Sequence, residues 1–434
     1  MVRLPRLWYR VRSTFWFVPA FIVTGAILLA FGMIEADARY IDAGALEAWP
    51  RLFGAGASAS RSMLAAVAGS MITVAGTVFS ITLVALSLAS SQYSSRVLRN
   101  FMRDRTNQAV LGVFVGIFAY CLVVLRAIHG EGGAAFVPSV AVFLGLLLGF
   151  GGIGMLVFFI HHIAESIQAS RILEAVRSET CNAIDRLFPG SADADDGRDA
   201  WPACLDWHEV RRADTAGYLQ VVEFERLCDL AIAHGVRLKV HAGIGDYILP
   251  GQRLLSTCPA PPEGLGDALA GACTIGRQRT LEQDVGYGIR QLVDVALKAL
   301  SPSVNDTTTA AMCIDSLTAI LADLAPRDLR FAGCDREDAR WIDAPHPRFD
   351  DLLDQAMDQI RHFGRGNVAV LQRLHWSLES LGARTSLPAR RAALGRQARR
   401  LHGVAGRELD DPEDRRSVLE AAGALLRTLD TAHG

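Results

Sequence analysis

The sequence predicts an α-helical integral membrane protein with four transmembrane helices, followed by a cytoplasmic α+β region that contains a small β-rich module and then a helical domain. Three observations lead to this fold class. The chain of 434 residues contains four long apolar runs, arginines gather near two of their ends, and short alternating segments replace the runs after Pro189-Gly190. A helix needs about 20 apolar residues to cross a bilayer, so each run is long enough to span.

The predicted organisation has four parts. A transmembrane domain occupies residues 1–170, a helical extension and linker occupy 171–200, the β-rich module occupies 201–280, and the helical cytoplasmic domain occupies 281–434. Within the first part, the spans are predicted at about 14–34, 63–91, 107–128 and 136–160. Residues 155–187 contain no proline or glycine, which predicts that the fourth helix continues past the membrane surface.

Arginine positions predict the orientation in the membrane. Residues 1–13 carry four arginines, and residues 96–105, between the second and third spans, carry four more against the single acid Asp104. Since positively charged loops remain in the cytoplasm, both segments are expected there, and four spans then place the C-terminal region on the same side. We therefore expect a multi-pass protein with cytoplasmic N- and C-termini.

Composition and motifs argue against several classes of function. The formal net charge of −2, with no basic domain, argues against a nucleic-acid partner. The eight cysteines include no C-x-x-C pair, so we expect reduced thiols and neither a zinc site nor a disulfide framework. His161 and Glu165 are one helical turn apart, but two ligands do not make a metal site. No phosphate-binding glycine loop, nucleophile elbow or metalloprotease motif occurs, so we expect neither an enzyme nor a cofactor.

The second span is the most distinctive of the four. It has no charge and no proline between residues 63 and 91, and its hydroxyl groups recur at steps of three and four, which places them along one helix face. The candidate pore-lining residues are Ser70, Thr73, Thr77, Ser80 and Ser87. Small and hydroxylated residues let transmembrane helices pack closely, whereas hydroxyls facing water in a pore replace part of an ion's hydration shell. Both interpretations remain open on the sequence alone.

The most distinctive segment of the C-terminal region is residues 279–316, RTLEQDVGYGIRQLVDVALKALSPSVNDTTTAAMCIDS. Together with residues 73–101, TVAGTVFSITLVALSLASSQYSSRVLRNF, it resembles the bacterial predicted membrane protein family called domain of unknown function 2254. The resemblance extends over nearly the whole chain. It implies a multi-span protein of the bacterial inner (plasma) membrane with a cytoplasmic C-terminal half, and it implies no established reaction and no catalytic residues.

Helical spacing gives the charged residues of this segment a structural interpretation. Arg290, Asp294 and Lys298 follow one another at steps of four, so Asp294 can pair with both cations on one helix face. Asn305-Asp306 is expected to cap the next helix, with Asp306 accepting from the amides of Thr308 or Thr309.

The same residues also allow an anion site. A threonine-rich helix N-terminus close to two cations could hold a phosphate or a nucleotide. The candidates for this motif or site are Arg290, Asp294, Lys298, Asn305, Asp306 and Thr308. The spacing alone does not choose between capping and anion binding.

Two functions from different classes follow. The first is a homo-oligomeric channel or pore, lined by the hydroxyl-rich second span and regulated by the cytoplasmic domain. The alternative is a membrane-anchored sensor or scaffold whose cytoplasmic module binds a small anionic ligand or a protein without solute transport. A membrane enzyme would need ionisable groups within the spans, and the second and fourth spans have none before His161. An uncharged, hydroxyl-rich span with an arginine-rich exit favours the channel, whose partners would be the lipid bilayer, further copies of the chain and an ion or small anion.

The predicted topology can be tested with reporter fusions. A reporter joined after Ala134 should read as periplasmic because it follows the third span, and one joined after Asp196 should read as cytoplasmic because it follows the fourth. Alkaline phosphatase and a fluorescent protein give complementary signals at the same fusion sites. The reverse pattern would contradict the four-span orientation.

Overall fold

The computed structural model describes residues 16–40, 56–92, 105–129, 136–166, 168–192, 206–331, 335–336 and 339–430. The chain divides into two compact units, Met1–Gln168 and Ala169–Gly434, which are considered separately below. The arginines at 3–12 and 96–103 and the linker at 193–200 lie outside the described residues. The orientation of the spans therefore stays a prediction.

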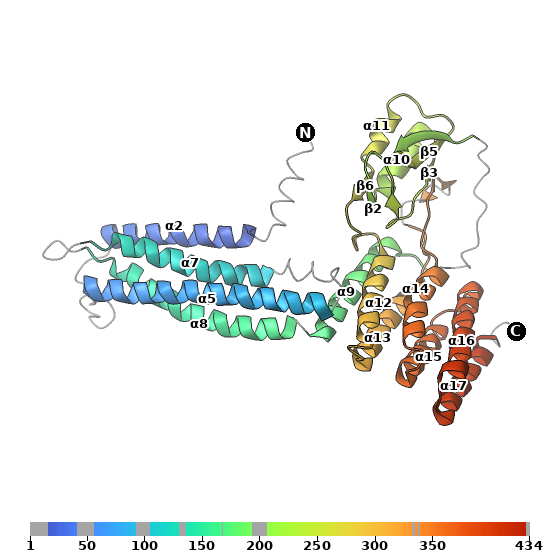
Figure 1. Cartoon of the computed structure of the whole chain (residues 1–434). Coiled ribbons are helices and arrows are strands. Elements are labelled where there is room, and N and C mark those ends of the chain that lie inside the picture. Colours follow the sequence, from blue (N-terminus) through green and yellow to red (C-terminus); the bar gives the residue numbers. More distant parts are fainter. Residues whose placement is uncertain are drawn as a thin grey trace. The chain divides into compact units, whose positions relative to one another are not determined.

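The first unit consists of four long apolar helices, which confirms this part of the predicted fold class (Figure 1). They are α2 (Phe17–Tyr40), α5 (Ala57–Gln92), α7 (Arg105–Ala127) and α8 (Ser139–Ser166). Helix α7 packs against each of the other three, and its side chains Phe114, Tyr120 and Cys121 are fully buried. By length and composition, each of the four helices can cross a bilayer.

Glycines on α7 and α8 hold this bundle together, because they let neighbouring helices approach closely. A Cβ atom added to Gly112 of α7 would lie 2.9 Å from Cα of Pro19 on α2. On α8, three glycines at steps of four and three receive larger side chains from α5. The pairs are Gly145 with Leu64, Gly149 with Val67, and Gly152 with Met71. These contacts determine which face of α5 turns into the bundle.

A separate helix, not a continuation of α8, follows the fourth span. Helix α8 ends at Ser166, and α9 runs over Ala169–Leu187. The expected uninterrupted helix over 155–187 is therefore wrong. At the end of α8, Ser166 Oγ donates to the carbonyl of Ile163 at 3.0 Å and Gln168 N donates to the carbonyl of Glu165 at 3.2 Å. The backbone bond from Gln168 is of the i-to-i−3 type that tightens the last turn at a helix end.

The next part of the second unit is a small mixed α/β module, in line with the strand-like segments of the sequence. Its strands are β1 (His208–Arg212), β2 (Gly217–Val222), β3 (Arg237–Val240), β4 (Tyr247–Ile248), β5 (Arg253–Cys258) and β6 (Cys273–Gly276), with helices α10 (Phe224–His234) and α11 (Leu265–Ala270) between them. A later strand, β9 (Ile342–Asp343), completes one sheet in the order β1-β5-β3-β9, and the other sheet has the order β4-β2-β6.

The remaining part is a stack of helical hairpins. Its helices are α12 (Val285–Ala299), α13 (Thr307–Leu324), α14 (Phe349–Phe363), α15 (Val368–Gly382), α16 (Pro388–Glu408) and α17 (Pro412–Asp430). The hairpins α12–α13, α14–α15 and α16–α17 follow α9 in that order, and each packs on the next (Figure 1). The predicted helical character of the C-terminal part of the chain is thus confirmed.

Residues 335–343 differ from the purely helical expectation for 281–434. They form β7 (Asp335–Arg336) and β8 (Ala339–Arg340), which pair with each other, and then β9. Strand β9 runs parallel to β3, with Leu238 opposite Ile342, and both of these side chains are buried. The helical hairpins and the α/β module therefore share one sheet.

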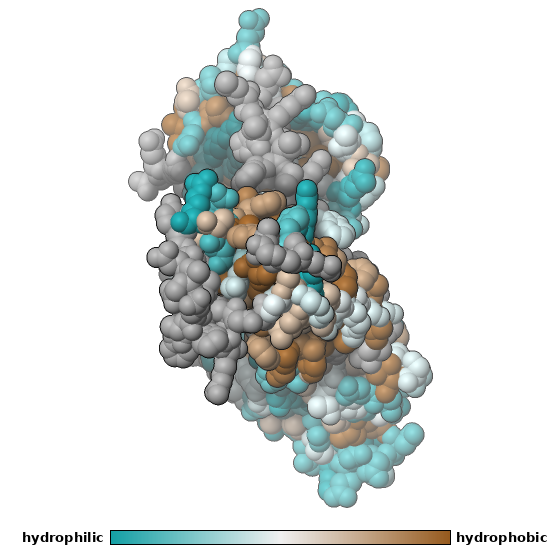
Figure 2. Space-filling model, turned by 90° about the vertical axis from the view of Figure 1, so that its left-hand side faces the viewer, coloured by the Kyte–Doolittle hydropathy of each residue, from teal (hydrophilic) through white to brown (hydrophobic). Residues whose placement is uncertain are grey.

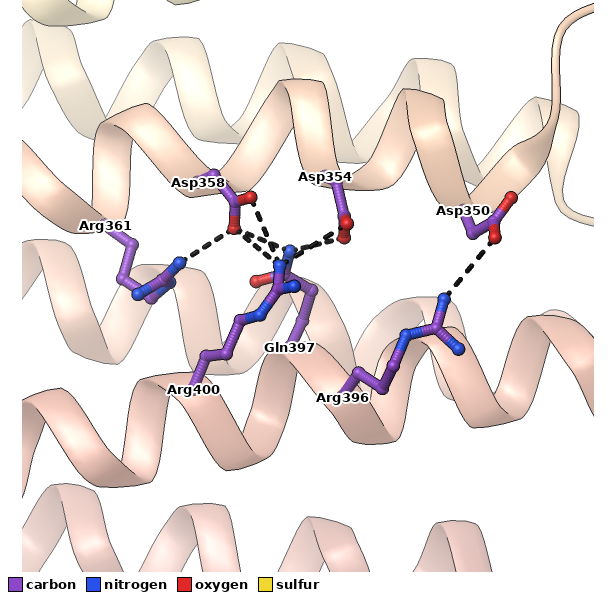
Figure 3. Close-up of polar contacts among 7 residues, drawn as sticks. All are labelled: Asp350, Asp354, Asp358, Arg361, Arg396, Gln397 and Arg400. Carbon is purple, nitrogen blue, oxygen red and sulfur yellow. Dashed lines mark hydrogen bonds and ion pairs between the residues drawn. The ribbon is translucent and has the colours of Figure 1, made fainter.

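Acids on α14 and polar groups on α16 join the second and third hairpins (Figure 3). The Gln397 amide donates to Asp354 at 2.7 Å and to Asp358 at 2.9 Å, and Arg400 donates to Asp358 at 3.0 Å. Burial opposes ionisation of Asp358, but the bonds from Gln397 and Arg361 and the charge of Arg400 outweigh it, so the pKa of Asp358 is lowered. A lowered carboxylate pKa stabilises the fold at neutral pH, and this contribution is lost as the pH falls through that pKa.

The cysteines depart from expectation at one position. The free thiols among the described residues are Cys121, Cys181, Cys228, Cys273 and Cys313. Cys258 is disulfide-bonded, so the expectation of reduced thiols is wrong there. Because disulfides are typical of oxidising compartments, the reporter test of orientation bears directly on the compartment of this unit.

Arg390 fastens the start of α16 to the end of α13. Its buried guanidinium donates to the carbonyls of Leu324, Ala325 and Arg327 at 2.8–3.0 Å and lies 5.4 Å from the ring centroid of Phe349. Carbonyls at a helix C-terminus have no partners within the helix, and a cation there also interacts favourably with the helix dipole.

We expect Arg390→Met to lower the free energy of unfolding by about 2–4 kcal/mol, because several buried carbonyls lose their donors. Arg399→Met, an exposed position on the same helix, is the matched control and should cost less than about 0.5 kcal/mol. Thermal unfolding of the purified chain in detergent measures both. Equal melting temperatures for the two variants would contradict an anchoring role for Arg390.

Candidate functional site

The two faces of α5 differ in chemistry. The inward face consists of Leu64, Ala68, Met71, Ala75 and Val78, all buried in the bundle. The five hydroxyl candidates lie on the outward face: Ser70, Thr73, Thr77, Ser80 and Ser87 are all exposed. Within the part of the chain that the structure describes, the stripe therefore does not pack against another helix of the same copy.

On the outward side of α5, one stripe carries no side chain larger than threonine, and the large exposed side chains of Met63, Ile72 and Phe79 flank it. Its members over residues 62–80 are Ser62, Ala65, Ala66, Gly69, Ser70, Thr73, Gly76, Thr77 and Ser80, all exposed. A Cβ atom added to Gly69 or Gly76 would meet no other described atom within 4 Å. We call this set the small face of α5.

The hydroxyl groups of the small face bind their own helix. Ser70 donates to the carbonyl of Ala66 at 2.7 Å, Thr73 to that of Gly69 at 2.8 Å, and Thr77 to that of Thr73 at 3.1 Å. Each donor is therefore satisfied without a neighbour, while the hydroxyl oxygen keeps acceptor capacity. Such a surface tolerates a nearby helix and can also accept hydrogen bonds from water.

The outward faces of α2 and α8 are different, because they present large apolar side chains. Phe21 of α2 is 74% exposed, and Phe150 and Val157 of α8 are 69% and 65% exposed. Brown, hydrophobic atoms gather on the side of the molecule that faces the viewer in Figure 2, which is the left-hand side of Figure 1. Large apolar side chains are what lipid tails solvate well, so the outward faces of α2 and α8 suit a lipid environment, and the small face of α5 differs from them in side-chain size.

In the second unit, the motif at 279–316 is built around a buried ion pair. Arg279 binds Asp284 with two bonds, Nε to Oδ2 at 2.7 Å and Nη2 to Oδ1 at 2.8 Å. Asp284 also caps α12 by accepting from Tyr287 N at 2.9 Å. Burial raises the pKa of Asp284, although the bonds from Arg279 and Tyr287 act in the opposite direction.

Other elements pack closely against the start of α12 at two glycines, Gly245 and Gly288. Gly245, in the turn before β4, has φ +88°, and a Cβ atom there would lie 2.3 Å from Oδ2 of Asp284. At Gly288 of α12, a Cβ atom would lie 2.1 Å from Oγ1 of Thr180 on α9. The α/β module, α9 and the first hairpin therefore meet at the start of α12.

The charged residues predicted to lie on one face of α12 behave in part as expected. Arg290 Nη2 lies 2.7 Å from Asp294 Oδ1, and Arg290 also donates to Gln359 of α14 at 3.0 Å. Lys298 is exposed, and the ion pair described for Asp294 is the one with Arg290. Arg290 and Asp294 therefore form an ion pair on α12, and Arg290 also joins the first hairpin to the second.

The cap of α13 forms at the predicted residue. Asp306 accepts from Thr309 N at 3.0 Å and from Thr309 Oγ1 at 2.6 Å, and these bonds lower its pKa. Asn305 adopts the left-handed conformation with φ +47°, and Thr308 is exposed. Because a carboxylate already occupies this helix N-terminus, an added anion would meet like charge there.

Comparison with known proteins places the chain in a family. Residues 12–380 match the family model described as Predicted membrane protein (DUF2254). The chain belongs to this family. It is 36% identical over 386 residues to Uncharacterized protein Rv1290c of Mycobacterium tuberculosis and to Uncharacterized protein Mb1321c of Mycobacterium bovis, a match that covers 86% of this chain and 73% of each relative. No solved structure matches the chain.

The DUF2254 match includes both α5 and the motif at 279–316, whose central contacts the sequence revealed only in part. Arg279 and Asp284 stand five residues apart in the motif, which is a local signal for an ion pair. Gly245 gives no such signal because its contact with them crosses over 30 positions of sequence. Within the described residues, no group of three or more metal-ligating side chains forms, and His161 lies 3.5 Å from Glu165 as a simple pair.

Two glycines of the α/β module test the contact between this module and the motif. Gly245→Ala should lower the free energy of unfolding by about 3–5 kcal/mol, because the methyl group displaces one partner of a buried ion pair. Gly251→Ala is matched in backbone conformation, with φ +80°, but faces open space. It should cost only the strain of a left-handed residue, about 1–2 kcal/mol.

Denaturant unfolding of the purified chain, followed by circular dichroism, measures both glycine variants. A cost at Gly245 no greater than that at Gly251 would show that the approach to Asp284 does not tie the module to α12.

Proposed function

We propose that the protein is a homo-oligomeric membrane channel in which the small face of α5 from neighbouring copies surrounds a central pore, with the C-terminal unit regulating it. The observation that carries the proposal is the outward direction of this face. Among the described residues of one copy, no helix packs against the hydroxyl stripe, and the stripe differs from the apolar outward surfaces of α2 and α8.

Self-association is the first step of the proposal. Without a hydrophobic driving force in lipid, transmembrane helices associate through close packing at small residues. Gly69 and Gly76 lie on the outward side of α5 with open space above them, in contrast to the glycines of α7 and α8 that are used inside the bundle. A second copy of α5 fits this surface, because its own small face offers the same close approach.

The second step of the proposal is that the small face lines a water-filled pore. The small face contains Ser70, Thr73, Thr77 and Ser80 at successive turns, and the hydroxyl oxygens retain acceptor capacity after binding their own helix. Hydroxyl oxygens at this spacing can replace part of the hydration shell of a permeating ion. With 36 residues, α5 is about 54 Å long, which exceeds the bilayer core.

The second candidate is a membrane-anchored sensor or scaffold that assembles through α5 without transport. It is favoured by the same internal hydrogen bonds, because hydroxyls already satisfied by the backbone pack against another helix without needing water. In that case the small faces would close on one another and leave no lumen.

Thr77→Leu separates these candidates. In a pore, the larger apolar side chain projects into the lumen, so conductance in planar bilayers should fall strongly while the oligomer persists. In a closed helix contact, the same change forces backbones apart, so the oligomer should dissociate and wild-type protein should give no current. Val157→Leu on the lipid-facing side of α8 is the matched control and should alter neither reading.

Oligomer mass in nanodiscs and single-channel current give the two measurements. If Thr77→Leu changes neither of them and wild-type protein is monomeric, the small face is only lipid-exposed and the proposed function fails.

A further inference from the structure

The turns of the first two helical hairpins form one end of the helical stack. Residues 300–306 connect α12 to α13, and residues 363–367 run from the end of α14 to α15. Asn367 Nδ2 donates to Thr307 Oγ1 at 2.9 Å, so the two turns lie side by side. We call these two turns the hairpin tip.

The hairpin tip exposes large apolar side chains beside basic ones. Val304 is 50% exposed and Phe363 is 59% exposed. Lys298, six residues before Val304, and Arg365, two residues after Phe363, are also exposed, and Arg365 Nε lies 3.6 Å from Glu408 Oε2. An apolar side chain flanked by lysine or arginine is the pattern of surfaces that enter the headgroup region of a membrane.

Charge changes along the stack. The turn of the third hairpin, between α16 and α17, presents the exposed acids Asp410 and Asp411 and no large exposed hydrophobic side chain. An anionic lipid surface repels such a turn and attracts basic ones. The apolar and basic side chains of the tip therefore fit a lipid surface. Of the three hairpin turns, those of the first two hairpins carry this combination.

Helix α9 begins at the same end of the stack as the hairpin tip. Helices α9 and α13 run in the same direction. Near their starts, Ser170 of α9 and Met312 of α13 line one surface pocket. At their other ends, Arg327 lies 2.5 Å from Asp185. The start of α9 therefore lies beside Met312, about one turn after the start of α13, and so at the same end of the stack as the tip.

The covalent chain keeps this end close to a membrane surface. Ala169 is three positions after Ser166, the last residue of α8, and three residue steps span about 11 Å at most. Helix α8 is long and apolar enough to cross the bilayer. Whatever the angle between the two units, the start of α9 stays within this distance of the end of a spanning helix.

From these observations we propose that the hairpin tip binds the surface of the bilayer that the chain itself spans. Val304 and Phe363 enter the headgroup region, and Lys298 and Arg365 contact the phosphates of anionic lipids. This gives the SPSV turn of the family motif, Ser301–Val304, a role as a membrane contact. The proposal does not depend on whether α5 lines a pore.

Contact with lipid can be measured on the full-length chain in nanodiscs. A small fluorophore is attached through Phe363→Cys or Val304→Cys, and the discs contain phosphatidylglycerol with or without a lipid that carries a nitroxide on its headgroup. Leu249→Cys in the α/β module is the matched control, because Leu249 is also 59% exposed. Protein without an added cysteine supplies the background, since Cys181 and Cys273 are half-buried.

The spin-labelled lipid should quench the fluorophore at 304 and 363 and leave that at 249 nearly unchanged. Adding Lys298→Glu should weaken the quenching at 363 in phosphatidylglycerol discs and not in phosphatidylcholine discs. Melting temperatures near that of the unsubstituted chain confirm that the labelled variants fold. Equal quenching at 363 and 249 would overturn the proposal, and so would a fluorophore at 363 that is shielded from water but not quenched by the lipid, since a protein partner would then cover the tip.

Discussion

The fit of α5 side chains over the glycines of α8 is the constraint on which the membrane unit depends. Leu64, Val67 and Met71 lie over three glycines that leave no room for a Cβ atom without a shift. Helix geometry fixes the direction in which each side chain projects. When Leu64, Val67 and Met71 point into the bundle, Gly69, Thr73 and Thr77 must therefore point outward. A polar stripe exposed on the bundle is therefore a consequence of tight packing on the other side.

The second unit depends on a different kind of contact, a buried ion pair that would be costly without its partners. Asp284 is nearly inaccessible, and it remains acceptable there because Arg279 and the Tyr287 amide supply hydrogen bonds. The turn at Gly245 covers the pair from the α/β module. Removal of any one of these groups leaves a buried charge without its hydrogen-bond partner. The segments that carry them therefore depend on one another through this polar contact as well as through apolar packing.

Sequence patterns within a short stretch of chain predicted those features of the fold that depend on neighbouring residues. Apolar run length gave the four spanning helices, and capping chemistry placed Asp306 at the start of α13. Contacts between distant residues could not be read in this way. Strand β9 has two residues and no periodicity, Arg390 looks like any arginine of a basic helix, and the break at 166–169 has neither proline nor glycine to mark it. The hydroxyl stripe was visible in the sequence, but its outward direction depends on which neighbours α5 has.

Packing contacts within each unit, together with the covalent chain between α8 and α9, connect the two regions that carry the family resemblance, the second span and the motif at 279–316. Helix α5 packs on the glycines of α8, α8 leads to α9 through residues 167 and 168, and Thr180 of α9 lies against Gly288 of α12. Contiguity of this kind permits coupling but does not establish it, because coupling needs an element with two arrangements that both sites bias. In this series, the step from α8 to α9 runs through the chain itself, whereas the other two steps are close packing at glycines.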